Sequence, residues 1–265
     1  MSKVKSLLIA VETGNFHEVK QLVDQGVDVN SKNYYDFNPL RSAVSSGSLE
    51  IVKYLVENGA DVNCESDRVD SPLHSAVSSG SLEIVKYLVE SGADVNCESD
   101  CVDSPLHSAA SSDSLEIVKY LVDHGANVNF ELFMCGSPLH TAASSGLLEI
   151  VKYLVENGAN VNFESFDVGS PLHSAASSGS LKIVKYLVEH GADVNCKDWR
   201  SKPVIHNAVK FGSLEMVECL VEHGAELTNE ENLDMLTILF LACERGNASV
   251  VDYLLQHGAI KDLNN

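Results

Sequence analysis

The strongest constraint on this chain is a period of 33 residues that runs through nearly all of its 265 residues. The run Ser-Pro-Leu-His recurs in register, beginning at Ser71, Ser104, Ser137 and Ser170. The run Leu-Glu-Ile-Val-Lys-Tyr-Leu-Val does the same, beginning at Leu49, Leu82, Leu115 and Leu148. Self-similarity at a fixed period of about 20–50 residues is typical of stacked repeats, so we expect a solenoid.

Each period predicts a first short helix, as the repeat that contains Ser71 illustrates. Ser71 is a favoured N-cap, and Pro72 suits the first helical position, where a missing N–H costs nothing. Gly80 is expected to end this helix. The apolar stripe expected between these two signals consists of Leu73, Ala76 and Val77.

A second short helix is expected directly after the first. Ser81 is predicted to cap it and Gly92 to end it. Residues 94–96 are expected to lead out to the next repeat in an extended conformation. The buried stripe expected on this helix consists of Leu82, Val85, Leu88 and Val89.

Neither helix is long enough to be stable alone in water, so neighbouring repeats must bury each other's apolar stripes. We therefore predict an all-α solenoid that forms a single domain over residues 1–265, with the first and last repeats acting as caps. The approximate repeats are 1–33, 34–66, 67–99, 100–132, 133–165, 166–198, 199–231 and 232–265.

Ser-Pro-Leu-His-x-Ala in a period of 33 residues resembles the signature of the ankyrin-repeat family. The resemblance implies eight stacked helix–turn–helix units with projecting β-hairpin-like loops, covering roughly residues 5–260. One feature departs from the family, which usually has a glycine at the loop tip. Here that position holds Val69, Val102, Cys135, Val168 and Ser201, and we expect a glycine one residue later, Gly136 or Gly169, to compensate in two repeats.

Histidine and cysteine recur at fixed positions, but neither set predicts a metal site. Neighbouring histidines of the ladder formed by His74, His107, His140, His173 and His206 would lie about 10 Å apart, too far to share a zinc ion. We expect each imidazole to bind backbone groups near the loop of its own repeat. Cys64, Cys97 and Cys196 share one position, which we interpret as a packing site. No metal or cofactor is predicted.

An asparagine follows a valine near the end of six repeats. We expect its side chain to bind backbone groups across the loop. In the family, an asparagine eight residues after a leucine also resembles the target of an asparaginyl hydroxylase. The candidate hydroxylation sites are Asn30, Asn63, Asn96, Asn129, Asn162 and Asn195.

Pairs of serines lie near the end of five first helices, at a position that faces the concave side of ankyrin stacks. The pairs begin at Ser45, Ser78, Ser111, Ser144 and Ser177. They are interpreted either as small groups that let a partner's backbone approach, or as filler copied by duplication. No histidine or acid accompanies them in an arrangement that would activate a nucleophile, and no phosphate-binding loop is present, so we predict no enzyme activity.

The repeats differ most at their loop tips, which carry no packing duty. Aromatic residues, methionine and arginine gather there, and these types are enriched in binding hot spots. The alternative is that the tip aromatics pack on neighbouring loops. The candidate partner-binding residues are Tyr34, Tyr35, Phe37, Arg68, Phe133, Met134, Phe166, Asp167, Trp199 and Arg200.

The chain carries 38 acids against 18 bases, a formal net charge of −20. This charge disfavours nucleic acid and anionic membranes as partners. No apolar run is long enough to span a membrane, and the N-terminal apolar run is too short for a signal peptide. We predict a monomeric cytoplasmic or nuclear protein that binds a partner protein as a scaffold or adaptor. The alternative is an acidic regulatory sequesterer that masks a basic segment of a transcription factor or similar protein.

Overall fold

The computed structural model describes residues 3–32, 38–64, 71–97, 104–227 and 233–257. The chain divides into two compact halves, Met1–Asn127 and Val128–Asn265, which are called the N-terminal and C-terminal halves below. The described residues form sixteen α-helices, two per repeat, as the sequence predicts. The prediction of a single domain over the whole chain stays a prediction.

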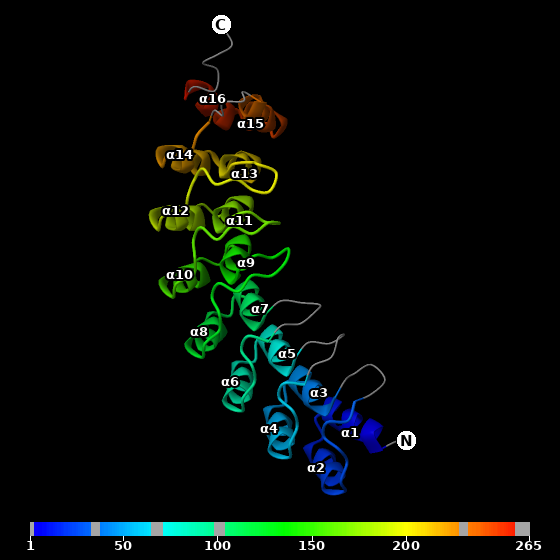
Figure 1. Ribbon diagram of the computed structural model, residues 1–265. Coiled ribbons are helices and arrows are strands. Elements are labelled where there is room, and N and C mark those ends of the chain that lie inside the picture. Colours follow the sequence, from blue (N-terminus) through cyan, green and yellow to red (C-terminus); the bar gives the residue numbers. More distant parts are fainter. Residues whose placement is uncertain (1–2, 33–37, 65–70, 98–103, 228–232, 258–265) are drawn as a thin grey trace. The chain divides into compact units, whose positions relative to one another are not determined.

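In the N-terminal half the helices alternate between the first and second positions of the repeat (Figure 1). They are α1 (Lys3–Glu12), α2 (Phe16–Asp24), α3 (Pro39–Ser45), α4 (Leu49–Glu57), α5 (Pro72–Ser78), α6 (Leu82–Glu90), α7 (Pro105–Ser111) and α8 (Leu115–Asp123).

The C-terminal half continues the same alternation. Its helices are α9 (Pro138–Ser144), α10 (Leu148–Glu156), α11 (Pro171–Ser177), α12 (Leu181–Glu189), α13 (Val204–Phe211), α14 (Leu214–Glu222), α15 (Leu233–Glu244) and α16 (Ala248–Gln256).

In the repeat that contains Ser71, the first helix begins as predicted, whereas the second does not. The hydroxyl of Ser71 accepts the backbone N–H of His74 at 3.2 Å, and Pro72 occupies the first turn of α5. Ser81 precedes α6 but makes no side-chain cap, so that prediction is wrong. Its backbone, with φ −86° and ψ 84°, lacks the extended conformation of Ser71 (ψ 158°) that is typical of an N-cap.

The apolar stripes of each repeat form the core. Leu73, Ala76 and Val77 of α5 are at most 1% exposed, as predicted. On α6 the fully buried side chains are Ile84, Val85 and Leu88. The predicted Leu82 and Val89 are only half-buried, because they lie at the edges of the apolar face.

Within each half, first helices pack on first helices and second helices on second helices, so the helices form two layers (Figure 1). In the C-terminal half, α9, α11, α13 and α15 form one layer, and α10, α12, α14 and α16 form the other. The described helices include none that is long and apolar enough to cross a lipid bilayer.

The link between repeats is a turn, so the predicted extended conformation is wrong. The backbone N–H of Cys97 donates to the carbonyl of Asp94 at 3.3 Å. The carboxylate of Asp94 also accepts the N–H of Asn96 at 2.9 Å. This side-chain-to-backbone bond offers the chain a turn in place of an extended strand.

All six asparagines join successive repeats through the same pair of hydrogen bonds. The amide nitrogen of Asn96 donates to the carbonyl of Gly125 at 3.0 Å, and its oxygen accepts the N–H of Asn127 at 2.8 Å. The five others bond the residues at the same offsets in the following repeat. The expected bonds to backbone are confirmed, and the groups that they satisfy belong to the next repeat. Hydroxylation of these asparagines stays a prediction.

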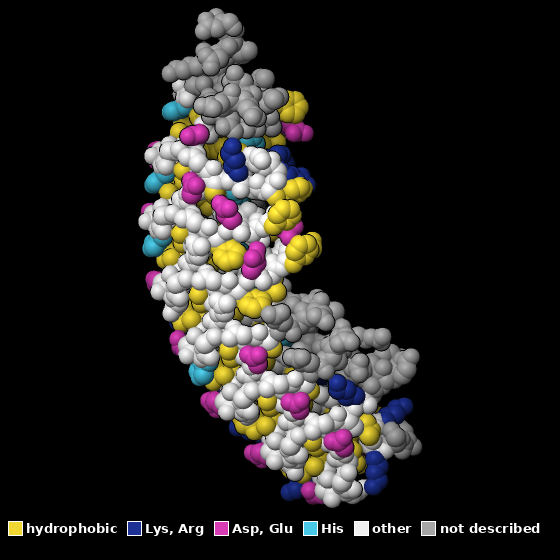
Figure 2. Space-filling model, in the orientation of Figure 1, with side chains coloured by type: hydrophobic (Ala, Val, Ile, Leu, Met, Phe, Trp, Pro, Cys, Tyr) yellow, Lys and Arg dark blue, Asp and Glu magenta, His cyan; other side chains and the backbone are white. Residues whose placement is uncertain are grey.

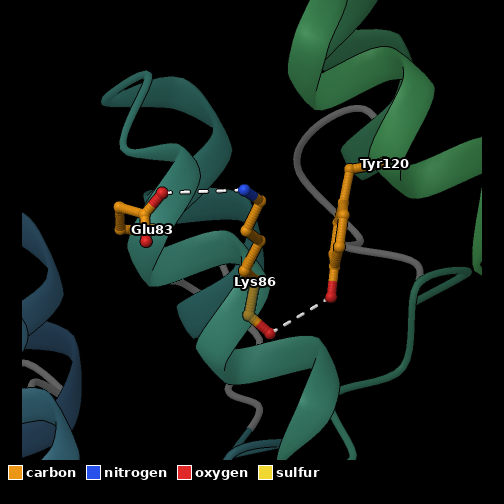
Figure 3. Close-up of polar contacts among 3 residues, drawn as sticks. All are labelled: Glu83, Lys86 and Tyr120. Carbon is orange, nitrogen blue, oxygen red and sulfur yellow. Dashed lines mark hydrogen bonds and ion pairs between the residues drawn. The ribbon is translucent and has the colours of Figure 1, made fainter.

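Tyrosines add bonds between second helices. The phenol of Tyr120 on α8 donates to the carbonyl of Lys86 on α6 at 3.4 Å (Figure 3). The Lys86 ammonium lies 3.6 Å from the carboxylate of Glu83 on its own helix. The hydrogen bond therefore ties two repeats together, while the ion pair stays within one helix.

Candidate functional site

The three loop tips of the C-terminal half that the structure describes are short hairpins, each closed by one antiparallel bridge. We call them the fingertips. The bridges join Leu132 to Gly136, Ser165 to Gly169, and Lys197 to Pro203. The projecting hairpin-like loops expected from the ankyrin resemblance are therefore present in these repeats.

A glycine one residue beyond the usual position supplies the left-handed backbone in two fingertips, as predicted. Gly136 has φ +72° and Gly169 has φ +75°. A Cβ atom at Gly169 would lie 3.0 Å from Nδ1 of His173, so the imidazole also restricts this position to glycine. In the third fingertip Ser201 itself adopts φ +59°.

The second and third fingertips are each held by a histidine of the preceding repeat. Nδ1 of His140 accepts the backbone N–H of Ser137 at 3.0 Å, which leaves Nε2 as the protonated nitrogen. Nε2 then donates to the carbonyl of Gly169, 3.0 Å away in the next fingertip. His173 repeats the contact with the carbonyl of Lys202 at 3.1 Å. Burial lowers the pKa of His173, which keeps this imidazole neutral.

The histidine ladder therefore confirms one expectation and extends it. The predicted bond of each imidazole to the loop of its own repeat is present at His140 and His173. The second bond, to the fingertip of the following repeat, was not predicted. Sequence periodicity could not reveal it, because the bond joins residues 29 positions apart.

The shared cysteine position packs against the N-cap serine of a first helix, as predicted. Sγ of Cys196 lies 3.1 Å from the hydroxyl of Ser170, and the residue is 9% exposed. Burial raises the pKa of its thiol to about 11 and raises that of Cys64 as well. Thiols that stay protonated are poor nucleophiles and poor metal ligands, which agrees with a packing role.

The fingertips present their large side chains to solvent. The exposed fractions are 81% for Phe133, 66% for Met134, 76% for Phe166 and 53% for Trp199. Figure 2 shows hydrophobic side chains standing along one edge of the C-terminal half. Side chains of this size are rarely left in water without a function when they stand together.

Neighbouring fingertips also contact one another. The rings of Phe166 and Trp199 stack with their centroids 6.5 Å apart. The carboxylate of Asp167 accepts the backbone N–H of Met134 at 3.1 Å. The alternative that tip aromatics pack on neighbouring loops is therefore true of one pair, yet both of its rings remain more than half exposed.

The structure brings together six of the ten residues predicted to bind a partner. Arg200 completes this set, with its guanidinium 4.4 Å from the centroid of the Trp199 ring. The other four, Tyr34, Tyr35, Phe37 and Arg68, lie outside the described residues.

A groove that sequence reasoning missed adjoins the third fingertip. Its volume is about 240 Å³, and it lies between residues 198–202, the helix α13 and Leu241 of α15. Lys210 and Phe211 line it from α13. The signal was available, because these two residues stand 33 positions after Ser177 and Ser178, where five earlier repeats carry the serine pair.

Comparisons with known proteins decide the family. A family model described as ankyrin repeats (3 copies) matches residues 3–66, 64–132, 131–198 and 199–265. The chain belongs to the ankyrin-repeat family. Its fold is the all-α ankyrin stack, and ankyrin repeats are general protein–protein interaction modules.

Two solved structures are similar to this ankyrin-repeat protein. The ankyrin repeat domain of human ASB11 is 28% identical, with a TM-score of 0.73, and the match covers 83% of this chain and 98% of that one. The ankyrin repeat domain of Bcl-3, described as a unique member of the IkappaB protein family, is 28% identical with a TM-score of 0.72, over 82% and 97% of the two chains. The search of curated proteins gave no match.

Proposed function

We propose that this ankyrin-repeat protein is a non-enzymatic scaffold or adaptor that binds a partner protein through its fingertips and the adjoining face of the first helices. The observation that carries the proposal is the row of exposed apolar side chains at Phe133, Met134, Phe166 and Trp199. Rigid hairpins hold these side chains, so binding orders little of the protein itself. We propose that it acts as a monomer in the cytoplasm or nucleus.

The test is to replace Phe133, Phe166 and Trp199 by Ala together in the full chain. Truncating an aromatic hot spot costs about 1–2 kcal/mol or more, so capture of cellular partners is expected to fall more than tenfold. Helical circular dichroism and the melting temperature should stay unchanged, because all three rings are exposed.

The matched control replaces Ile9 and Leu255 by Ala, two large side chains that are also exposed but belong to the helices α1 and α16 rather than to a fingertip. This variant should capture the same partners as the parent protein. Equal loss in both variants, or an unchanged set of partners after the triple replacement, would show that the fingertips are not the binding surface.

A second candidate function rests on the net charge of −20. An acidic regulatory sequesterer would mask a basic segment of another protein, such as a transcription factor. Binding of a lysine- and arginine-rich peptide should then weaken strongly between low ionic strength and about 150 mM salt, where charges are screened beyond about 8 Å. A partner that binds through the fingertip aromatics should show little dependence on salt.

A further inference from the structure

The third fingertip and α13 carry a charge opposite to that of the rest of the chain. Residues 197–211 contain four bases, Lys197, Arg200, Lys202 and Lys210, against one acid, Asp198. The remainder of the chain holds 14 bases and 37 acids. Three of the four bases, all but Lys197, line the groove beside α13, and we call this site the basic groove.

Asp198, the one acid among residues 197–211, accepts hydrogen bonds from the backbone of its own turn. Oδ1 of Asp198 accepts the backbone N–H groups of Arg200 and Lys202, both at 2.9 Å. In the described part of the chain, Arg200, Lys202 and Lys210 have no carboxylate within ion-pair distance. The groove therefore holds cationic groups that no carboxylate among the described residues neutralises.

Aromatic rings hold two of these cations in place. The Arg200 guanidinium lies 4.4 Å from the Trp199 ring centroid, and the Lys210 ammonium lies 4.6 Å from that of Phe211. Arg245 directly follows α15, the next helix in the layer of α13, and its guanidinium lies 5.9 Å from the centroid of the Phe211 ring. A guanidinium on a ring face keeps donors at its edge that bind a carboxylate through two parallel hydrogen bonds.

The size of the groove excludes some occupants. Its volume of about 240 Å³ is below the roughly 300–1,000 Å³ of most small-molecule sites, yet it can take one large side chain. Its walls combine the exposed rings of Trp199 and Phe211 with the aliphatic Leu241. Such a site fits an apolar side chain with anionic neighbours.

We propose that the basic groove binds an acidic segment of a partner protein, with one large apolar side chain of that segment in the groove and its carboxylates on Arg200, Lys202 and Lys210. The proposal rests on the proposed function, because it names the chemistry of the partner at one end of the fingertip row. Charge complementarity carries it, since three bases that no described carboxylate neutralises line the groove beside the apolar side chains of Trp199, Phe211 and Leu241.

A nucleic acid fits these observations less well. Its affinity comes from many phosphate contacts along an extended track. Here the bases are confined to one groove, and the helix α14 of the same half carries Glu215, Glu218 and Glu222. A long polyanion needs a track of bases longer than the three that line this groove, whereas a short acidic segment does not.

The experiment uses the full chain and its own fluorescence. Trp199 is the only tryptophan of the protein and lines the groove, so its emission reports occupancy without a label. The probe is a synthetic peptide in which glutamates flank a single phenylalanine. Titration at low ionic strength is expected to shift the emission to the blue and to reduce quenching by acrylamide. The affinity should fall as salt is added.

Three double variants assign the effect to the groove. K202Q/K210Q removes two bases of the groove, and each exposed charge pair contributes a factor of roughly two to five in affinity, so binding should weaken about four- to twenty-five-fold. K182Q/K185Q removes two exposed bases of α12, outside the groove, and should bind like the parent protein. K202R/K210R keeps the charge and should retain binding.

Several outcomes would overturn the proposal. A peptide with glutamines in place of the glutamates that binds equally well, equal losses in K202Q/K210Q and K182Q/K185Q, or tighter binding of an oligouridylate would each do so. Failure of the glutamate peptide to bind, together with loss of cellular partners in the triple alanine variant, would reject this inference alone. If the triple variant also keeps its partners, the proposed function falls with it.

Discussion

At the scale of single residues, polar side chains at fixed positions join the repeats. Asn162 donates to the carbonyl of Gly191 and accepts the N–H of Asp193, both at 2.8 Å. His140 binds its own Ser137 and the next fingertip in the same way. Each side chain satisfies one donor and one acceptor of backbone that would otherwise lack a partner in a turn. Coupling between neighbours therefore depends on these residues as well as on apolar burial.

Replacing Asn162 by Ala tests this coupling. The change removes two hydrogen bonds between repeats, each worth about 0.5–1.5 kcal/mol, so we expect the free energy of unfolding to fall by about 1–3 kcal/mol. Urea unfolding followed by circular dichroism measures it. Asn157→Ala is the control, because Asn157 makes a single side-chain bond to Tyr153 within its own helix. Equal effects of the two changes would argue against a role in coupling.

The thiol of Cys196 gives a pH-dependent prediction. Its pKa is about 11 in the folded protein, above the ordinary value of 9.0, because burial disfavours the thiolate. Because the pKa is raised, the thiol makes its full contribution to the free energy of unfolding below pH 9, and this contribution is lost as the pH rises towards 11. The urea midpoint should therefore fall less between pH 8 and pH 10.5 in Cys196→Ala than in the parent protein. An identical fall in both proteins would contradict the prediction.

At the scale of elements, each repeat combines helices that are too short to be stable alone with a hairpin that is too small to be stable alone. The helix α11 has seven residues and α12 has nine, which is below the roughly 12–15 residues that an isolated helix requires. Each fingertip contains one bridge, and the second and third are also bonded by a histidine of the preceding repeat. These elements hold their conformation because their neighbours supply the missing contacts.

Gly169→Ala tests how the fingertip is held. The left-handed backbone at φ +75° costs a residue with a Cβ about 1–2 kcal/mol, and this Cβ would also press on the His173 ring. Gly191→Ala is the control, because Gly191 has φ +86° but nothing within 4 Å of the added atom. We expect a larger fall in melting temperature for Gly169→Ala. If Gly191→Ala lowers it as much, the histidine contact does not restrict this turn.

At the scale of the whole molecule, stability is a property of neighbouring repeats rather than of any one of them. The buried stripes of α11, for example, face α9 on one side and α13 on the other. A repeat removed from its neighbours exposes both faces. The same stack carries a net charge of −20, so the basic groove is a local exception within an acidic surface.

Excision of one repeat provides the test at this scale. A peptide of residues 137–169 should show little helical circular dichroism, because its apolar stripes have nothing to pack against. The fragment 128–265, which corresponds to the C-terminal half, should remain helical and unfold cooperatively on heating. A folded single repeat would mean that stacking is not what stabilises the helices.

The sequence by itself determined the period, the two helices of each repeat, the caps of the first helices and the exposed aromatic tips. These features depend on spacings of one to four residues or on an exact repeat, so a reader of the sequence can find them. The sequence also shows that Gly136 and Gly169 replace the missing tip glycine, because each lies one residue beyond the usual position.

Only the tertiary structure decided how the repeats are joined and where the basic groove lies. Asn162 and His173 each reach backbone 29 residues further along the chain, and Leu241 lines the same groove as Trp199. Such contacts depend on the distance and rotation between stacked repeats, which packing sets. Local spacing carries no information about these contacts. The replacement of the serine pair by Lys210 and Phe211 marks the groove in the sequence, but only the packing shows that Leu241 of the next repeat lines it as well.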